Sequence, residues 1–447
     1  MCQPNSSTST MVAEPEGSTS TGTRSRRTSS DKDSAAAEMK PAASSQIKSS
    51  TSSTARLTSV PEVQKPKTSS DLVTKLSDIE LTDEKAERNE FHFRYFGLLD
   101  NFLIKNFMKD KRDLPLVYLQ LNIMTFLVPF AAAVVYFNTW YLGLIYLPIL
   151  FVGFFERFIL MMHFSSHRKL YHSEFLNNIT LYFYAPLFGT PPGIYYLHHI
   201  IMHHGENNHG DDVSETESYH RSERGFRGFL FYWLRFLCGL SFELPLYALK
   251  TKRYDWFATC LVSLSFWGAT IFALGNLFGY TGVTCVLVIP HFFGLTAMAL
   301  GNYAQHVFVD PLSPGNNYTL SYNCLNTEVN QTTFNDGYHI IHHIYPRLHW
   351  TELPSKFRST LAQHKTERAL TFRNTHFIPI ALLMLTNQME KLVRDHYVFI
   401  DWAAVKREGG EVPITSLDKE VVPTVGEVVA DLERRLSYIP PYDRKIQ

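Results

Sequence analysis

The chain contains two long stretches in which charged residues are absent. No Asp, Glu, Lys or Arg occurs over the 42 residues from Leu114 to Phe155, or over the 54 residues from Trp256 to Val309. A helix needs about 20 apolar residues to cross a bilayer, so each stretch can hold two crossings and a turn. Turn-forming residues stand inside both stretches, at 138–139 and at 276–279. The pattern predicts four transmembrane helices arranged as two hairpins.

The distribution of basic residues predicts how these hairpins are oriented. Basic residues precede each hairpin, whereas neither predicted turn contains any: Lys105, Lys109, Lys111 and Arg112 before the first, and Lys250, Lys252 and Arg253 before the second. Positive residues stay on the cytosolic side, so the hairpin ends are expected in the cytosol. Two further apolar stretches, 178–197 and 226–249, are interrupted by Pro, Gly or charged residues. We expect these to be interfacial helices that lie in the membrane plane.

Composition divides the chain into three parts. Residues 1–90 contain no aromatic residue, and 28 of the first 70 are Ser or Thr, so this segment is predicted to be a disordered tail. Arg24, Arg26 and Arg27 leave an organelle-targeting segment as the alternative, although nearby acidic residues count against it. Residues 91–389 are the predicted membrane domain, and residues 390–447 a charged C-terminal cap or tail. The net charge of zero gives no reason to expect nucleic acid, and five scattered cysteines form no disulfide framework.

Histidines are the second organising feature. Seventeen of the 19 lie between positions 163 and 376. Most fall in short clusters with spacings of three or four residues: His163 and His167; His199, His203 and His204; Asn302 and His306; and His339, His342 and His343. Residues at these spacings share one face of a helix. Four short helical stretches would therefore present nine imidazoles toward one space.

Local punctuation supports helices at the second and third clusters. Pro191, Pro192 and Gly193 precede the second cluster, and Gly205 is expected to end its helix. At the third cluster, Asn335 or Asp336 is expected to cap the helix and Pro346 to end it.

Nine clustered imidazoles predict a metal site. A lone histidine is usually a surface or core residue, and a single cluster could serve as a polar anchor at the membrane. Nine neutral rings on one membrane face instead call for a cation to share their lone pairs. Imidazole suits Zn, Cu, Fe and Ni alike. Structural zinc takes four ligands, usually including cysteine, whereas nine rings can serve two metals. Two such metals with an open position suggest iron that handles dioxygen.

The clusters resemble the three histidine boxes of the integral-membrane fatty acid desaturase and hydroxylase superfamily. The similarity covers about 114–350 and is strongest at the third box, from Asn335 to Pro346, and at Asn302 with His306. It implies an all-α membrane protein with four transmembrane helices and a cytosolic helical cap that holds a histidine-rich di-metal site. It also implies the ligands, which are His163, His167, His199, His203, His204, His306, His339, His342 and His343, with Asn302 holding a metal-bound water.

Some assignments remain open at this point. His172 fits a longer first box, HxxxxH, and could replace His163 or His167, while His198 could stand in for His199. His209 and His291 are expected to have supporting or structural roles. Four acidic residues are candidates for orienting the imidazoles: Asp211, Asp212, Asp310 and Asp336.

The resemblance implies an enzyme with two iron ions and dioxygen as co-substrate, which inserts a double bond into a long-chain fatty acyl lipid. The chain has no GxGxxG loop and no fused haem motif, so a separate electron donor is expected, either a cytochrome b-type protein or a ferredoxin. The expected location is the endoplasmic reticulum membrane, with the site in the cytosol, or a plastid membrane. A lipid hydroxylase or ketolase is the alternative, and a metal transporter or non-catalytic metal protein is a third reading.

Overall fold

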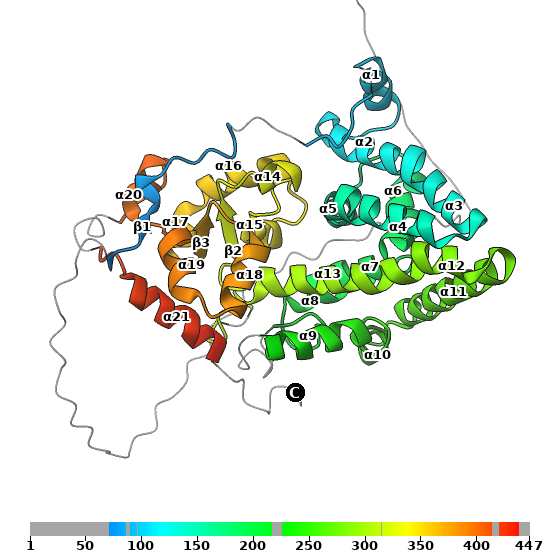
Figure 1. Cartoon of the computed structure of the whole chain (residues 1–447). Helices are drawn as coiled ribbons and strands as arrows, with labels where there is room; N and C mark the ends of the chain where they lie inside the picture. The colour runs from blue at the N-terminus through cyan, green and yellow to red at the C-terminus, as the bar shows by residue number, and fades with distance from the viewer. Residues whose placement is uncertain are drawn as a thin grey trace, which may run out of the picture. The chain divides into compact units, whose positions relative to one another are not determined.

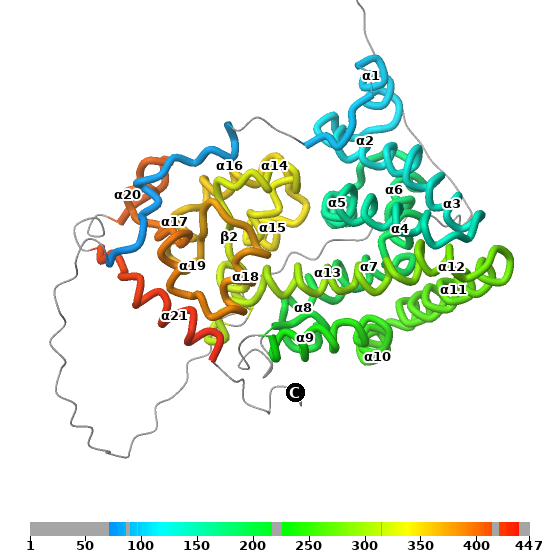
Figure 2. The backbone as a smooth tube through the Cα atoms, viewed as in Figure 1, coloured from blue at the N-terminus to red at the C-terminus, as the bar shows by residue number. Residues whose placement is uncertain are grey.

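The computed structural model describes residues 71–85, 90–95, 97–216, 226–313, 315–413 and 420–437. The described part is mostly helical (Figures 1 and 2). The predicted tail from residue 1 to 70 lies outside the described residues.

Four helical stretches are long and apolar enough to cross a membrane: Lys111–Phe137, Trp140–His167, Tyr254–Phe278 and Tyr280–His306. The first contains α2 (Leu114–Asn122), η4 (Ile123–Leu127) and α3 (Val128–Phe137), and the second contains α4 (Trp140–Pro148), η5 (Ile149–Phe155) and α5 (Glu156–His167). The third is α11 (Tyr254–Phe278), and the fourth contains α12 (Tyr280–Val283), η10 (Thr284–Val288) and α13 (Ile289–His306). The two uncharged runs thus yield two candidate spans each.

The breaks between paired spans fall where turn residues stand in the sequence. Asn138 adopts a left-handed conformation with φ of 50° and ends α3. Gly279 separates α11 from α12 with φ of 98°, a conformation that favours glycine. The Asn138 side chain accepts a hydrogen bond from the Gly282 backbone N–H at 2.8 Å. This bond ties the two breaks to each other.

The segment between the second and third spans is broken into short helices. These are α6 (Glu174–Ile179), η6 (Thr180–Tyr184), η7 (Ala185–Phe188), α7 (Ile194–Tyr196), η8 (Leu197–His203), α8 (His204–Glu206), α9 (Phe226–Gly239) and α10 (Glu243–Lys250). The α9–α10 pair is apolar enough for a span but is bent by 64°. Arg235 of α9 forms ion pairs with Glu215 and with Glu243 at the start of α10.

Close backbone contact fixes α13 against the loop before the second histidine cluster. A Cβ atom on Gly294 would lie 2.3 Å from the carbonyl oxygen of Phe188, so only glycine fits there. The ring of Phe188 stacks on that of Phe158 in α5, with centroids 3.7 Å apart. Helices that carry different histidine clusters therefore meet on one packed core.

The C-terminal region adds helices and short strands beyond the fourth span. Its helices are α14 (Val329–Thr332), α15 (His339–Ile344), α16 (Leu353–Ser359), α17 (Leu361–Thr366), α18 (Phe377–Leu385), α19 (Met389–His396), α20 (Trp402–Arg407) and α21 (Val425–Ser437). Strand β2 (Tyr322–Leu325) pairs in parallel with β3 (Leu370–Arg373), with Tyr322 opposite Leu370. These strands were not expected in an all-α protein.

The chain shows no structural break at the boundary expected between residues 389 and 390. Helix α19 begins at Met389, and its residues Leu392 and Val393 are buried. They belong to the same core as Leu295 of α13. The C-terminal residues described here therefore pack onto the domain that holds the histidines.

Part of the segment predicted to be a disordered tail is ordered. Residues 71–85 contain β1 (Thr74–Lys75), which pairs in parallel with β4 (Val398–Phe399), and the single turn η2 (Leu76–Asp78). Val73 and Leu76 are buried. The segment lacks aromatic residues, but its aliphatic side chains supply enough apolar surface to dock it.

Candidate metal centre

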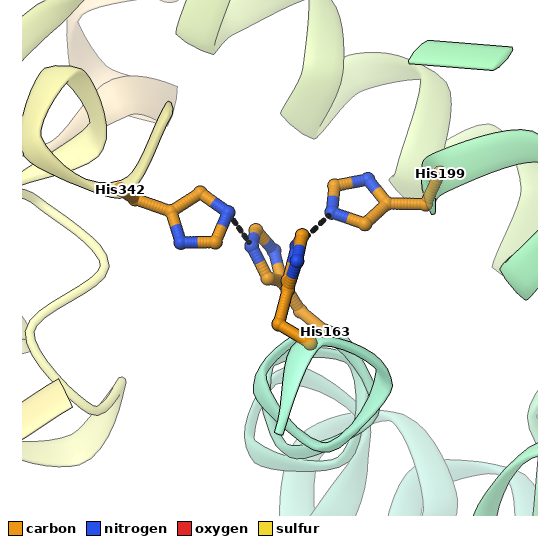
Figure 3. A group of neighbouring side chains, drawn as sticks. His163, His199 and His342 are labelled. Carbon is orange, nitrogen blue, oxygen red and sulfur yellow. Dashed lines mark hydrogen bonds between the residues drawn. The ribbon is translucent and has the colours of Figure 1, made fainter. Parts of the chain in front are cut away.

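The structure brings four of the clustered histidines into a first group. His163 and His167 come from α5, His199 from η8 and His342 from α15, and their ligand atoms lie within 4.8 Å of one another. The Nε2 atoms of His163 and His342 are 2.6 Å apart, and those of His167 and His199 are 3.1 Å apart. Figure 3 shows the labelled rings of His163, His199 and His342 pointing toward a common space.

A second group lies next to the first. It contains His203 at the end of η8, His306 at the end of α13 and His343 of α15, again with ligand atoms within 4.8 Å of one another. The ring centroid of His203 is 5.0 Å from that of His306 and 5.3 Å from that of His343. All three side chains are buried.

The two remaining predicted ligands lie between or beside these groups. The His204 ring is 4.5 Å from the His167 ring of the first group and 4.6 Å from the His343 ring of the second. The Nε2 atom of His339 is 3.2 Å from that of His343, and its ring is 5.2 Å from that of His306. All nine predicted imidazoles therefore converge.

Neighbouring histidines of one cluster serve different groups. His199 faces the first group and His203 the second, and His342 and His343 divide in the same way. The His199 stretch is a π-helix rather than an α-helix, a form that occurs often at functional sites. Each group therefore draws on segments from before and after the third and fourth spans.

Two expectations about local helix ends were wrong. Helix α15 has Tyr338 at its N-cap, and neither Asn335 nor Asp336 caps it. The Asn335 amide instead donates to the carbonyl of Trp350 at 3.0 Å, and Asp336 accepts from the side chain of Gln305. These longer-range partners outcompeted the local cap. At the second cluster, the helix continues through Gly205 and ends before Asn207, which adopts the left-handed conformation.

The donor set fits metal ions. Burial lowers the pKa well below the usual value for five histidines outside the spans, His199, His204, His339, His342 and His343. Rings with such pKa values are neutral at physiological pH and keep a lone pair for a metal. The Nε2 atoms of His204 and His306 are buried and have no hydrogen-bond partner among the described residues. Such unpartnered nitrogen atoms are costly unless a ligand satisfies them.

Hydrogen bonds on the far side of two rings direct Nε2 into the second group. Asp212 lies 2.6 Å from the Nδ1 atom of His203, and the carbonyl oxygen of Leu320 lies 3.1 Å from Nδ1 of His306. With Nδ1 protonated by these bonds, Nε2 becomes the free donor atom. The Asp212 side chain also accepts from the backbone and the hydroxyl of Ser214.

The other three candidate carboxylates behave differently. Asp336 lies 3.7 Å from the Nδ1 atom of His339, too far for a hydrogen bond. Asp211 pairs with the exposed Lys250, and Asp310 with Arg434 at 3.1 Å. Of the four candidate carboxylates, all of which are described in the structure, only Asp212 hydrogen-bonds a ring of the two groups.

The open alternatives for the ligand set can be placed. His172 is exposed, and neither histidine group includes it. His198 is buried with its Nε2 atom 4.0 Å from Asp212, outside both groups. The His291 Nδ1 atom lies 2.6 Å from the carbonyl oxygen of Gly189, which is a structural role. His209 also lies outside the groups.

A cavity of about 340 Å³ opens beside the histidines. Apolar side chains form much of its wall, and the histidines on it include His163, His199, His203 and His339. Asn302 lines it too, and its amide donates to the carbonyl of Ser214 and the hydroxyl of Tyr232. Its expected role in holding a metal-bound water stays a prediction.

Sequence reasoning missed the polar residues Glu156, Gln305 and His376 of this cavity. Glu156 ends the first uncharged run and stands seven residues before His163, which places both on one helix face. That spacing could have indicated that Glu156 lies near the histidine site. His376 is separated from the histidine clusters in sequence, and its position at the start of α18 gave no indication of the cavity.

The long apolar helices are typical of a membrane protein, and the buried histidine groups at their ends are typical of a metal site. A family profile described as fatty acid desaturase matches residues 138–372, more than half of the chain and a range that includes every predicted ligand. The chain therefore belongs to the fatty acid desaturase family, which identifies it as an oxidoreductase-type membrane protein. No match was found among curated proteins or among solved structures.

Proposed function

We propose that the chain is a di-iron enzyme that uses dioxygen and external electrons to insert a double bond into a long-chain fatty acyl lipid. One observation carries this proposal: nine imidazoles from four segments meet beside a largely apolar cavity at the ends of candidate membrane spans. Family membership supports the same reaction class.

The two histidine groups would each hold one iron ion, with His204 and His339 completing the sets. Iron supplies the dioxygen activation that removal of hydrogen from an unactivated C–H bond requires. The chain supplies neutral imidazoles whose Nε2 atom is free to bind the metal. Asp212, for example, holds the proton of His203 on Nδ1 and so leaves Nε2 free. The donor atoms alone do not select iron over zinc or copper, so the choice of iron rests on the family.

The cavity would place a substrate methylene against the histidines and exclude water from it. Its apolar wall includes Ile159 and Leu160 of α5 and Met298 and Leu300 of α13. These helices continue into candidate spans, so an acyl chain could enter from the bilayer. Exclusion of water protects the reacting carbon from side reactions.

Electrons would enter where the centre is least buried. Of the nine imidazoles, only those of His167 and His204 are partly exposed, and the others are buried. We propose that a separate donor, a cytochrome b-type protein or a ferredoxin, approaches this edge. We place the edge in the cytosol, with the endoplasmic reticulum as the membrane and a plastid as the alternative.

Hydroxylation is the second candidate reaction, and the polar part of the cavity favours it. Glu156 and Gln305 line the cavity together with the histidines and could accommodate a hydroxyl group. Transport is less compatible, because His163, His167 and His306 stand at the ends of their spans rather than in the middle.

Lipid mass spectrometry of cells that express the chain with a reductase tests the proposal. Desaturation removes two hydrogen atoms from an acyl chain, whereas hydroxylation adds one oxygen atom. New unsaturated acyl chains should appear with the wild type and be absent with His342→Ala. Oxygenated lipids alone would replace the first proposal with the second, and the absence of both products would refute an enzymatic role.

A further inference from the structure

An ordered segment before the first span docks on the C-terminal region. This N-terminal strap, residues 71–85, is held by more than the β1–β4 pairing. The Arg407 guanidinium donates to the carbonyl oxygens of Ser77 and Ile79, each at 3.0 Å. The Ser77 backbone N–H donates to Asp401 at 3.0 Å. The strap is thus an integral part of the fold around the C-terminal helices.

The strap inserts one carboxylate beneath the third histidine cluster. Asp83 is only 2% exposed. One of its oxygen atoms, Oδ2, accepts from the hydroxyl of Tyr338 at 2.7 Å, from the backbone N–H of Asn326 at 2.8 Å and from the side chain of Asn330 at 3.3 Å. A buried carboxylate needs such donors to offset its desolvation. Tyr338 immediately precedes His339 in the sequence.

The backbone that leads into His339 is held closely by the partners of Asp83. The Gly337 N–H donates to the Asn330 side chain at 3.1 Å, and the Gly337 carbonyl accepts from the Cys324 N–H at 2.7 Å. A Cβ atom on Gly337 would lie 2.3 Å from that Asn330 side chain, so a larger residue does not fit there. Asp83 therefore orients Asn330 and Tyr338 together.

We propose that Asp83 is a positioning residue for His339, acting through Tyr338 and Asn330. This inference rests on the proposed function, because His339 is counted among the iron ligands. Loss of the carboxylate removes the acceptor of the buried Tyr338 hydroxyl and of the partly buried Asn326 N–H, and leaves the Asn330 amide only its bond to the Cys324 carbonyl. Tyr338 then moves to find another partner, and the first residue of α15, His339, moves with it. The strap, which precedes the membrane domain in the sequence, thus helps to position a ligand of the metal centre.

The test uses the full chain with Asp83→Ala and Tyr338→Phe. The first removes the oxygen atom that accepts all three hydrogen bonds, and the second removes a single hydroxyl group. Iron bound per chain and its rate of release to a chelator are measured in purified protein, alongside thermal unfolding of the metal-free form. Both variants should bind iron about 10-fold more weakly than the wild type, the lower end for residues that orient metal ligands, and should therefore release it faster.

Asp401→Ala is the matched control. Asp401 is also buried and also binds the strap, through Ser77, and among the described residues it forms no hydrogen bond with Tyr338. It should lower the unfolding temperature while iron release stays at the wild-type rate. Wild-type release from both Asp83→Ala and Tyr338→Phe would overturn the proposal, as would equally fast release from Asp401→Ala. A wild-type chain that binds no iron would instead refute the proposed function itself.

Discussion

The Nε2 atoms of His163 and His342 lie 2.6 Å apart, although 179 positions separate them in the chain. One is carried by the second candidate span and the other by a short helix after the fourth. Neither segment could hold a metal alone, because each contributes only two or three imidazoles. The centre therefore exists only when the whole membrane domain is folded.

Replacement of His342 should test the first group directly. His342→Ala should abolish turnover and lower bound iron while membrane insertion stays intact, since α15 lies outside the candidate spans. Iron analysis and activity of the purified variant measure this. His172→Ala is the control, because His172 is exposed and its removal should change neither quantity. Full activity in His342→Ala would remove the third cluster from the site.

The carboxylate beside His203 should matter for the second group. Asp212→Ala removes the partner of the His203 Nδ1 atom, so the ring can rotate or change tautomer. Iron affinity should fall about 10- to 100-fold. Metal titration of the variant gives this value, with Asp211→Ala as control, since Asp211 pairs with an exposed lysine. Equal affinities for the two variants would contradict the role of Asp212.

Filling the cavity should separate substrate binding from metal binding. A Cβ atom on Gly301, which lines the cavity, would meet no other atom within 4 Å. Gly301→Leu should therefore fold, hold normal iron and lose most turnover of long acyl chains. Gly268→Leu is a matched change at an exposed glycine in α11 and should remain active. Unchanged lipid products in Gly301→Leu would place the substrate elsewhere.

The metal-free protein should lose stability in mild acid. Burial lowers the pKa of His364 to about 4, from an ordinary value of 6.5. The unfolded chain then binds more protons than the folded one between those pH values, so stability falls as the pH drops through this window. His364 alone should cost about 2 kcal/mol at pH 5. Denaturant unfolding from pH 7.5 to 5 measures the slope, which His364→Gln should reduce. An identical slope in that variant would contradict the assignment.

Glycosylation reports the orientation. Asn178 and Asn317 stand in glycosylation sequons and are at least partly exposed, whereas the sequon residue Asn330 is buried. If the histidine centre faces the cytosol, all three should carry no glycan in cells. A loop with a sequon inserted between Asn138 and Thr139 should be glycosylated in the same cells. Glycan on Asn178 or Asn317 would show that the histidine centre faces the lumen instead.

The candidate spans and the residues of the histidine centre could be predicted because their signals are local. The absence of charge from Leu114 to Phe155 and from Trp256 to Val309 reflects the cost of burying charge in a bilayer. The breaks at Asn138 and Gly279 follow from residues that tolerate positive φ. Histidine spacing marked which side chains share a helix face.

The division of the histidines into two groups could not be predicted in the same way. Whether His199 or His203 faces a given group depends on the π-helical turn of η8 and on tertiary packing. The docking of the strap also escaped prediction, because the partners of Asp83 lie more than 240 positions away. Only the folded chain reveals why that one carboxylate is buried.

The hydrogen bond between Asp83 and Tyr338 also constrains how the chain threads the bilayer. Asp83 precedes the first candidate span and Tyr338 follows the fourth, yet atoms 2.7 Å apart must lie on the same side of the membrane. The intervening chain therefore crosses an even number of times. Four crossings satisfy this parity, whereas counting the bent pair α9–α10 as a fifth would violate it. His203 and His306 also lie on one side of the membrane, because their rings are 5.0 Å apart. The chain between them therefore crosses an even number of times, which the third and fourth spans satisfy, so α9 and α10 do not cross.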